Sequence, residues 1–307
     1  MHPDIHFSII IPTYNRGHII ARTIHSALNQ QYTNFEVIVV DDGGNDETEV
    51  IIKTFNHPAL HYFKKANAER GAARNYGVTK SKGDYITFLD SDDILYPDFL
   101  ANAFELATAN QPPFFHLAYE IKNERGKILH KMNYIKSNNT KFIERGNFLS
   151  CIGVFVRRDV ALNYTFNENM LLSGSEDWEL WIRLIAHFGI KTDNRISSCI
   201  VQHEERSVNN TDEKRLLDRK NLSINFAFSD KQVREKFGPS LSKIESHSLT
   251  YIAIHLAISG KKKRALFYLA KAFTRNPFVL VERRFGAIIK HVAFGALIKK
   301  NETIDLS

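Results

Sequence analysis

The stretch GDYITFLDSDD, residues 83–93, joins a short apolar run to a cluster of acids. The run is β-branched and aromatic in consecutive positions, which is typical of a strand buried on both faces of a parallel sheet. Asp90, Asp92 and Asp93 follow within four positions, and carboxylates this close repel one another unless something neutralises them. The cluster is therefore a solvated turn, a cap for the helix expected at 97–110, or a cradle for a cation.

A helix cap would explain Asp93, but it would not explain Asp90, which lies directly at the end of a strand. A bound cation accounts for Asp90 as well. In an extended segment, Asp90 and Asp92 lie on the same side of the chain. Carboxylate oxygens are the ligands that Mg²⁺ and Mn²⁺ prefer, commonly together with substrate phosphates. The spacing favours a divalent cation that screens a diphosphate.

Strand-like and helix-like segments alternate through the first 110 residues. The strand-like runs lie at 7–11, 35–40, 60–63 and 84–89, and the helix-like segments lie around 18–29, 47–56, 69–80 and 97–110. This alternation predicts an α/β fold with a Rossmann-like, mostly parallel central sheet flanked by helices. The polar segments PTYNR, DDGGND and DSDD follow three of the runs, so we expect them at the ligand-binding edge of the sheet.

The rest of the chain is predicted to extend this sheet and then to become helical. Strands are expected at 114–120 and 127–135 in an antiparallel extension, followed by a helix in SEDWELWIRLIAHF, residues 175–188. Apolar residues at helical spacing predict one buried face of that helix, made of Trp178, Trp181, Ile182 and Ile185. Helices are also expected at 250–259, 264–273 and 278–300, the last with one apolar stripe of Phe278, Val281, Phe285, Ile288, Ile289 and Val292.

Composition excludes several classes of protein. The hydrophobic share of 43% and the charged share of 24% are ordinary globular values. Two cysteines exclude a disulfide-dense scaffold and suit a reducing compartment. No secretory signal and no window of about 20 apolar residues is present, so the sequence predicts a cytoplasmic protein.

The net charge of +7 is concentrated in one region. Residues 261–307 hold eleven Lys and Arg against three acidic residues, so the rest of the chain is close to neutral. This pattern predicts an anionic membrane surface as a partner of that region alone, which would place the protein peripherally at the inner face of the plasma membrane. The alternative is a helical appendage with a solvated basic face that packs on the rest of the chain or forms a homodimer. No nucleic-acid partner is predicted.

Four motifs match one known family in order and spacing. They are FSIIIPTYNR, EVIVVDDGGNDET, RGAARNYGVTKSKGDYITFLDSDD and SEDWELW. With them the chain resembles a family 2 glycosyltransferase of GT-A fold over about residues 6 to 205. The resemblance implies a GT-A catalytic domain at 1–205, with a nucleotide-binding half at about 1–110 and an acceptor half at 111–205. A helical basic region at 206–307 would follow.

The resemblance also implies a reaction. It is the inverting transfer of one sugar from a nucleotide-sugar donor, a UDP-sugar, to a glycan or lipid-linked acceptor. Mn²⁺ or Mg²⁺ would be the cofactor, and bacterial cell-surface polysaccharide or lipopolysaccharide synthesis would be the setting. The Q-x-x-R-W signature of processive synthases is absent, which favours addition of a single sugar per encounter.

Residue roles follow from the same resemblance. Asp92 corresponds to the direct metal ligand, with His203 as a second ligand. Asp177 corresponds to the general base, with Glu176 and Trp178 on the acceptor side. The residues implied for the donor are Pro12, Thr13, Tyr14, Asp42, Arg74, Asp90 and Ser91.

Each role has a structural alternative. Asp42 could be a turn residue, Arg74 a solvated helix residue and His203 an ordinary surface histidine. Glu176 and Asp177 also suit the N-terminus of any helix, and Trp178 could simply anchor that helix in the core.

Two other functions compete with sugar transfer. A nucleotidyltransferase would need a loop rich in glycine and lysine after the first strand, but PTYNRG has one glycine and no lysine. A nucleotide-sugar-binding module without catalysis would not need Asp90, Asp92 and Asp177 together.

Overall fold

The computed structural model describes residues 4–132, 135, 140–203 and 212–294. The chain forms two compact units. The N-terminal unit is Met1–Thr140 with Leu149–Glu204, and the C-terminal unit is Lys141–Phe148 with Glu205–Ser307. The domain boundary expected between 205 and 206 lies outside the described residues.

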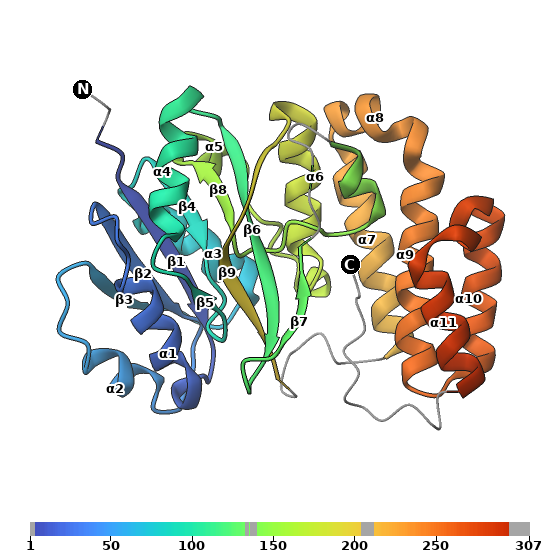
Figure 1. Ribbon diagram of the computed structural model, residues 1–307, viewed down its shortest axis with the longest axis horizontal. Helices are drawn as coiled ribbons and strands as arrows, with labels where there is room; N and C mark the ends of the chain where they lie inside the picture. The colour runs from blue at the N-terminus through green and yellow to red at the C-terminus, as the bar shows by residue number, and fades with distance from the viewer. Residues whose placement is uncertain (1–3, 133–134, 136–139, 204–211, 295–307) are drawn as a thin grey trace. The chain divides into compact units, whose positions relative to one another are not determined.

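The N-terminal unit begins with the predicted alternation of strands and helices (Figure 1). Its first elements are β1 (Phe7–Thr13), α1 (Gly17–Leu28), β2 (Phe35–Asp41), α2 (Thr48–Lys53), β3 (Leu60–Lys64), α3 (Glu69–Lys80), β4 (Tyr85–Phe88), β5 (Ile94–Leu95) and α4 (Phe99–Asn110). The later ones are β6 (Phe114–Asn123), β7 (Ile128–Lys131), β8 (Val154–Arg157), α5 (Arg158–Asn163), η2 (Met170–Leu172), α6 (Glu176–Phe188) and β9 (Lys191–Gln202).

The strands form one nine-stranded mixed sheet. Its order is β3-β2-β1-β4-β8-β6-β9-β5, and β7 pairs with β6. The strands β3, β2, β1 and β4 run parallel, β8 lies antiparallel between β4 and β6, and β6 is parallel to β9. The α/β fold with a parallel core and an antiparallel extension is confirmed.

Helices cover both faces of the parallel strands, which is why β1 and β2 are buried along their whole length. On one face, Ile20 and Ile24 of α1 join Phe99 and Leu100 of α4 in the main hydrophobic core. On the other face, α3 comes so close to β1 that a Cβ atom at Gly77 would lie 2.5 Å from Ile10. This close approach requires glycine at position 77.

Helix α6 also packs on that second face. The Trp181 ring lies 5.8 Å from Phe114 and 6.3 Å from Phe88, measured between ring centroids. The face predicted from the helical spacing is buried as expected, since Trp178, Trp181, Ile182 and Ile185 are each at most 6% exposed. This packing fixes the position of the first turn of α6.

The C-terminal unit is helical in its described part. Its elements are η1 (Thr140–Arg145, from its second residue on), α7 (Glu213–Ser229), α8 (Lys231–Phe237), η4 (Gly238–Ser240), α9 (Leu241–Ile258), α10 (Lys262–Arg275), η5 (Pro277–Val281) and α11 (Arg283–Phe294). A separate hydrophobic core joins α9, α10 and α11 through Ile252, Leu269 and Ile288. None of the helices in the described ranges has the length and apolar composition needed to cross a membrane.

The single helix with one apolar stripe expected at 278–300 is wrong in its first turns. Residues 277–281 form the 3₁₀ helix η5, and α11 begins only at Arg283. Phe278 and Val281 are exposed, whereas Ile288 is buried. Pro277 and the Asn276 cap start η5, and the break itself lies at Glu282, whose extended backbone separates η5 from α11. Residues 295–300 of the expected helix lie outside the described residues.

Candidate active site

The three polar segments do gather at one edge of the sheet, as predicted (Figure 1). Thr13 at the end of β1 is paired in register with Asp41 at the end of β2. On the other side of β1, Ile10 is paired with Phe88, the last residue of β4. Because these strands are parallel, the segments after them share the carboxyl edge.

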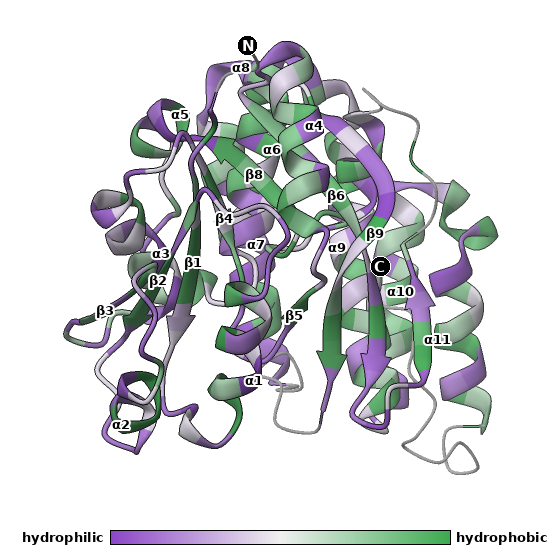
Figure 2. Cartoon of the chain, turned by 60° about the vertical axis from the view of Figure 1, so that its left-hand side comes forward, coloured by the Kyte–Doolittle hydropathy of each residue, from purple (hydrophilic) through white to green (hydrophobic). Residues whose placement is uncertain are grey.

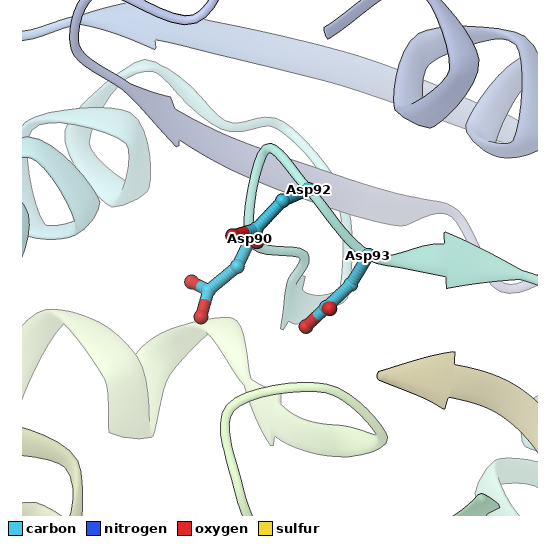
Figure 3. Close-up of side chains that lie close together, drawn as sticks. All are labelled: Asp90, Asp92 and Asp93. Atoms are coloured by element: carbon cyan, nitrogen blue, oxygen red, sulfur yellow. The ribbon is translucent and has the colours of Figure 1, made fainter. Parts of the chain in front are cut away.

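The acidic cluster lies in a tight turn between β4 and β5 (Figure 3). The backbone N–H of Asp93 donates to the carbonyl of Asp90 over 3.1 Å. One carboxylate oxygen from each of Asp90, Asp92 and Asp93 lies within 4.8 Å of the other two. The expectation of an extended segment is wrong, because the turn brings the side chains together. Their oxygens could hold one hard cation.

Two residues of α1 hold this turn. The Thr23 hydroxyl lies 2.9 Å from the carbonyl oxygens of both Ser91 and Asp93. The Arg22 guanidinium donates to the carbonyl of Asp92 over 3.0 Å. Sequence reasoning missed both, because a threonine and an arginine inside a helix give no signal of a partner about 70 residues away.

Asp93 does not cap the following helix. Its carboxylate accepts a hydrogen bond from the backbone N–H of Val201 in β9 over 3.0 Å. The N-cap residue of α4 is Asp98. The capping interpretation of the cluster is therefore wrong, and Asp93 instead ties the turn to the strand that leads to His203.

The two predicted metal ligands lie side by side. The Nε2 atom of His203 is 2.8 Å from Oδ2 of Asp92, and the two side chains are 10% and 12% exposed. His203 directly follows β9, and β9 pairs with β5 next to the acidic turn. A histidine nitrogen and carboxylate oxygens at one point form a mixed donor set that suits Mn²⁺.

Arg74 joins the acidic turn to the start of α6. Its side chain is only 1% exposed, so the solvated alternative is wrong. One end of the guanidinium lies 2.7 Å from Oδ1 of Asp90 and the other lies 2.9 Å from Oε1 of Glu176. Because both ends already pair with carboxylates, Arg74 aligns two acids, and its predicted direct contact with a diphosphate stays a prediction.

Glu176 is held in its charged form. Burial by itself raises the pKa of this carboxyl, but the nearby guanidinium groups of Arg70 and Arg74 outweigh burial and leave the pKa below its usual value. The second oxygen of Glu176 accepts from the backbone N–H of Gly174. Both oxygens are thus occupied, and the acceptor-binding role of Glu176 stays a prediction.

Asp177 and Trp178 differ in exposure. Asp177 is partly exposed in the first turn of α6, and its Oδ1 accepts from the backbone N–H of Trp178 over 2.8 Å. Trp178 is 6% exposed, which favours the alternative that it anchors the helix. The acceptor platform expected at Trp178 therefore has little ring surface available.

The residues predicted for the nucleotide lie around the end of β1. Pro12 and Thr13 are buried in the strand, while Tyr14 is 51% exposed. The Asp42 carboxylate lies 2.7 Å from Nζ of Lys65 and accepts from the backbone N–H of Ala68. Sequence reasoning missed Lys65, a residue just after β3 with no distinguishing pattern.

Comparison with known proteins points to one family. The family described as Glycosyl transferase family 2 matches residues 8–163. An uncharacterized glycosyltransferase of Rickettsia bellii is 35% identical over 185 residues, which cover 59% of this chain and 26% of that protein. The chain therefore spans far less than two thirds of that relative. The UDP-Glc:alpha-D-GlcNAc-diphosphoundecaprenol beta-1,3-glucosyltransferase WfgD of Escherichia coli is 29% identical over 196 residues, 64% of this chain and 73% of that protein.

Two solved structures share the fold. Staphylococcus aureus TarS 1–349 in complex with UDP-GlcNAc has a TM-score of 0.62 at 18% identity, covering 92% of both chains. The mannosyltransferase PcManGT of Pyrobaculum calidifontis, in complex with GDP-Man and Mn²⁺, has a TM-score of 0.58 at 17% identity, covering 96% of this chain and 87% of that one. The GT-A fold expected from the motifs is confirmed.

Proposed function

Because the chain belongs to glycosyltransferase family 2, we propose that it transfers one sugar from a UDP-sugar to a glycan or lipid-linked acceptor, with inversion at the anomeric carbon. The observation that supports this most is the pair of bonds from Arg74 to Asp90 and Glu176, which links the acidic turn to the helix that bears Asp177. In this proposal the N-terminal unit is the catalytic domain. Bacterial surface polysaccharide synthesis is the setting, as the name of the WfgD relative suggests.

The acidic turn would hold the cofactor. Asp92, with Asp90 beside it, offers the carboxylate oxygens that Mn²⁺ or Mg²⁺ accepts, and the nitrogen of His203 is a ligand for Mn²⁺ rather than for Mg²⁺. When bound, the cation would neutralise the donor diphosphate and stabilise it as a leaving group. Arg74 keeps Asp90 at a fixed place in the turn, so the donor side of the site is preorganised.

Asp177 would act as the general base. It would take the proton of the acceptor hydroxyl as that oxygen attacks the anomeric carbon on the side opposite the leaving nucleoside diphosphate. Asp177 lies beside the positive end of the α6 dipole, and Arg70 and Arg74 balance the charge of the neighbouring Glu176.

The donor base would lie at the end of β1. Pro12, Thr13 and the exposed Tyr14 offer a surface for it, and Asp42 would accept from the N3–H of uracil. Because Asp42 now accepts from Lys65 and Ala68, uracil would have to share that carboxylate with them. Glu176 and Trp178 would border the acceptor.

A donor screen tests the proposal. The full chain is incubated with UDP-, GDP- and dTDP-sugars with Mn²⁺ or with a chelator, and the products are separated by chromatography. Release of a nucleoside diphosphate that needs the cation and rises with added acceptor is the expected result. Release of pyrophosphate in a parallel incubation with a nucleoside triphosphate and a sugar 1-phosphate would make the protein a nucleotidyltransferase, and donor binding without any turnover would make it a binding module. Proton NMR of the first product reads the anomeric configuration.

A further inference from the structure

Large apolar side chains are exposed in the turn between α10 and α11. Phe278 is 75% and Val281 is 84% exposed, whereas Val279 between them is buried. The Asn276 side chain accepts from the backbone N–H of Phe278, so a local bond fixes the shape of this turn. Single exposed apolar residues are ordinary on protein surfaces, but a cluster of them marks an interaction site.

Helix α10 continues the cluster along its outer side. The inner side of the helix consists of residues at helical spacing that are all buried, namely Ala265, Tyr268, Leu269 and Ala272. Apolar residues are nevertheless also exposed on α10, and Figure 2 shows hydrophilic and hydrophobic bands alternating in this part of the chain. We call the exposed set the α10–η5 surface; it consists of Leu266, Phe267, Phe273, Phe278, Leu280 and Val281.

Basic residues are interleaved with these apolar ones. Residues 261–294 contain nine Lys and Arg against Glu282 as the single acid. The Nζ atom of Lys271 lies 4.7 Å from the ring centroid of Phe267, and Arg283 stands exposed after η5. Arg275 before η5 is also exposed, although its Nε lies 3.3 Å from a carboxylate oxygen of Glu245. Large apolar side chains among Lys and Arg are the composition of a segment that lies in a membrane interface.

We propose that the α10–η5 surface docks on an anionic lipid bilayer. Phe278, Leu280 and Val281 would enter the boundary between headgroups and acyl chains, and the neighbouring Lys and Arg would meet the anionic headgroups. A second copy of the chain fits this surface less well, because two such faces would bring like charges together. The proposal concerns binding only and does not depend on which sugar the N-terminal unit transfers.

Vesicle flotation with the full chain tests the proposal. The vesicles are phosphatidylcholine alone or an equimolar mixture with phosphatidylglycerol. We expect binding to the anionic vesicles only, and release as NaCl rises from about 0.05 M to about 0.5 M. The variant Phe278→Ser/Val281→Ser should bind at least about tenfold more weakly, because two side chains no longer enter the interface. Both residues are exposed, so the exchange removes little packing within the protein.

Two further variants make the result specific. Lys263→Gln/Lys271→Gln should weaken binding at low salt and reduce its dependence on salt. Val50→Ser serves as the matched control, because Val50 is a 66% exposed apolar residue on α2, and binding should stay unchanged. The far-ultraviolet circular dichroism of every variant should equal that of the wild type.

Three results would overturn the proposal. The first is a wild type that ignores anionic vesicles at low salt, and the second is equal binding by Phe278→Ser/Val281→Ser. The third is self-association in analytical ultracentrifugation that this double variant abolishes, which would assign the surface to a second copy. None of these measurements reads glycosyl transfer, so failure here leaves the proposed function standing.

Discussion

Replacement of Arg74 by methionine removes one charge from the centre of the candidate site. Methionine fills much of the same volume but leaves the Asp90 and Glu176 carboxylates without their shared partner, at 2.7 and 2.9 Å from the former guanidinium. Breaking one partner of a buried ion pair costs about 3–5 kcal/mol of unfolding free energy. Asp90 is 26% exposed and can turn to water, and Arg70 remains 3.9 Å from Glu176. We therefore expect Arg74→Met to lose unfolding free energy near the lower end of this range, roughly 3 kcal/mol.

The loss should depend on pH. In the wild type the pKa of Glu176 is lowered from about 4.5, so its contribution to stability is present above that value and is lost as the pH falls through the lower folded-state pKa. In Arg74→Met, burial without the guanidinium should raise this pKa instead. The difference in unfolding free energy between Arg74→Met and the wild type should consequently shrink as the pH is lowered from 7 to 4.

Urea unfolding followed by tryptophan fluorescence measures this difference. The chain has two tryptophans, Trp178 and Trp181, and both lie on α6, so the signal reports the N-terminal unit. Arg157→Met is the matched control, because its ion pair with Asp159 is exposed and should contribute at most about 1 kcal/mol. If Arg74→Met unfolds within about 1 kcal/mol of the wild type at pH 7, Arg74 does not hold the two acids as described.

Two further predictions concern single side chains. Asp177→Asn should lower transfer by at least about 10² while donor affinity stays nearly unchanged, and a variant that keeps more than half of the wild-type rate would remove Asp177 from the base role. Burial lowers the pKa of His116 to about 4, so the unfolded chain binds more protons between pH 6.5 and 4 and stability falls as the pH falls. The free energy of unfolding should fall by roughly 3 kcal/mol across this pH window because of His116. His116→Gln should make the free energy of unfolding less dependent on pH. An unchanged pH dependence, measured by urea unfolding, would contradict this role of His116.

Much of the fold could be predicted because the strands are buried on both faces. Continuous apolar runs at 7–11 and 35–40 were sufficient to locate β1 and β2 within a few residues. The parallel register then placed Thr13, Asp41 and the acidic turn on one edge without further information. The apolar pattern of each strand and the parallel topology of the sheet indicate the same arrangement, and a sequence predicts its structure well when both levels agree.

The supporting contacts of the site could not be predicted, because they join residues far apart in the sequence. Thr23 reaches the acidic turn from 68 residues away, and Arg74 reaches Glu176 from 102 residues away. Nothing in the residues next to Arg74 indicates that its guanidinium is buried. The C-terminal unit shows the opposite failure, since the spacing of Phe278, Val281 and Ile288 favoured a single helix, whereas the extended backbone of Glu282 divides the segment into η5 and α11.

Electron paramagnetic resonance of Mn²⁺ tests most directly whether the acidic turn and His203 hold the cation that binds the donor. The wild type should bind Mn²⁺, and UDP should tighten that binding, because the diphosphate completes the ligand set. Asp92→Asn should lose both effects, whereas Asp98→Asn, at the N-cap of α4 outside the cluster, should retain them. A Mn²⁺ spectrum that is equally affected by the wild type and by Asp92→Asn would contradict the account.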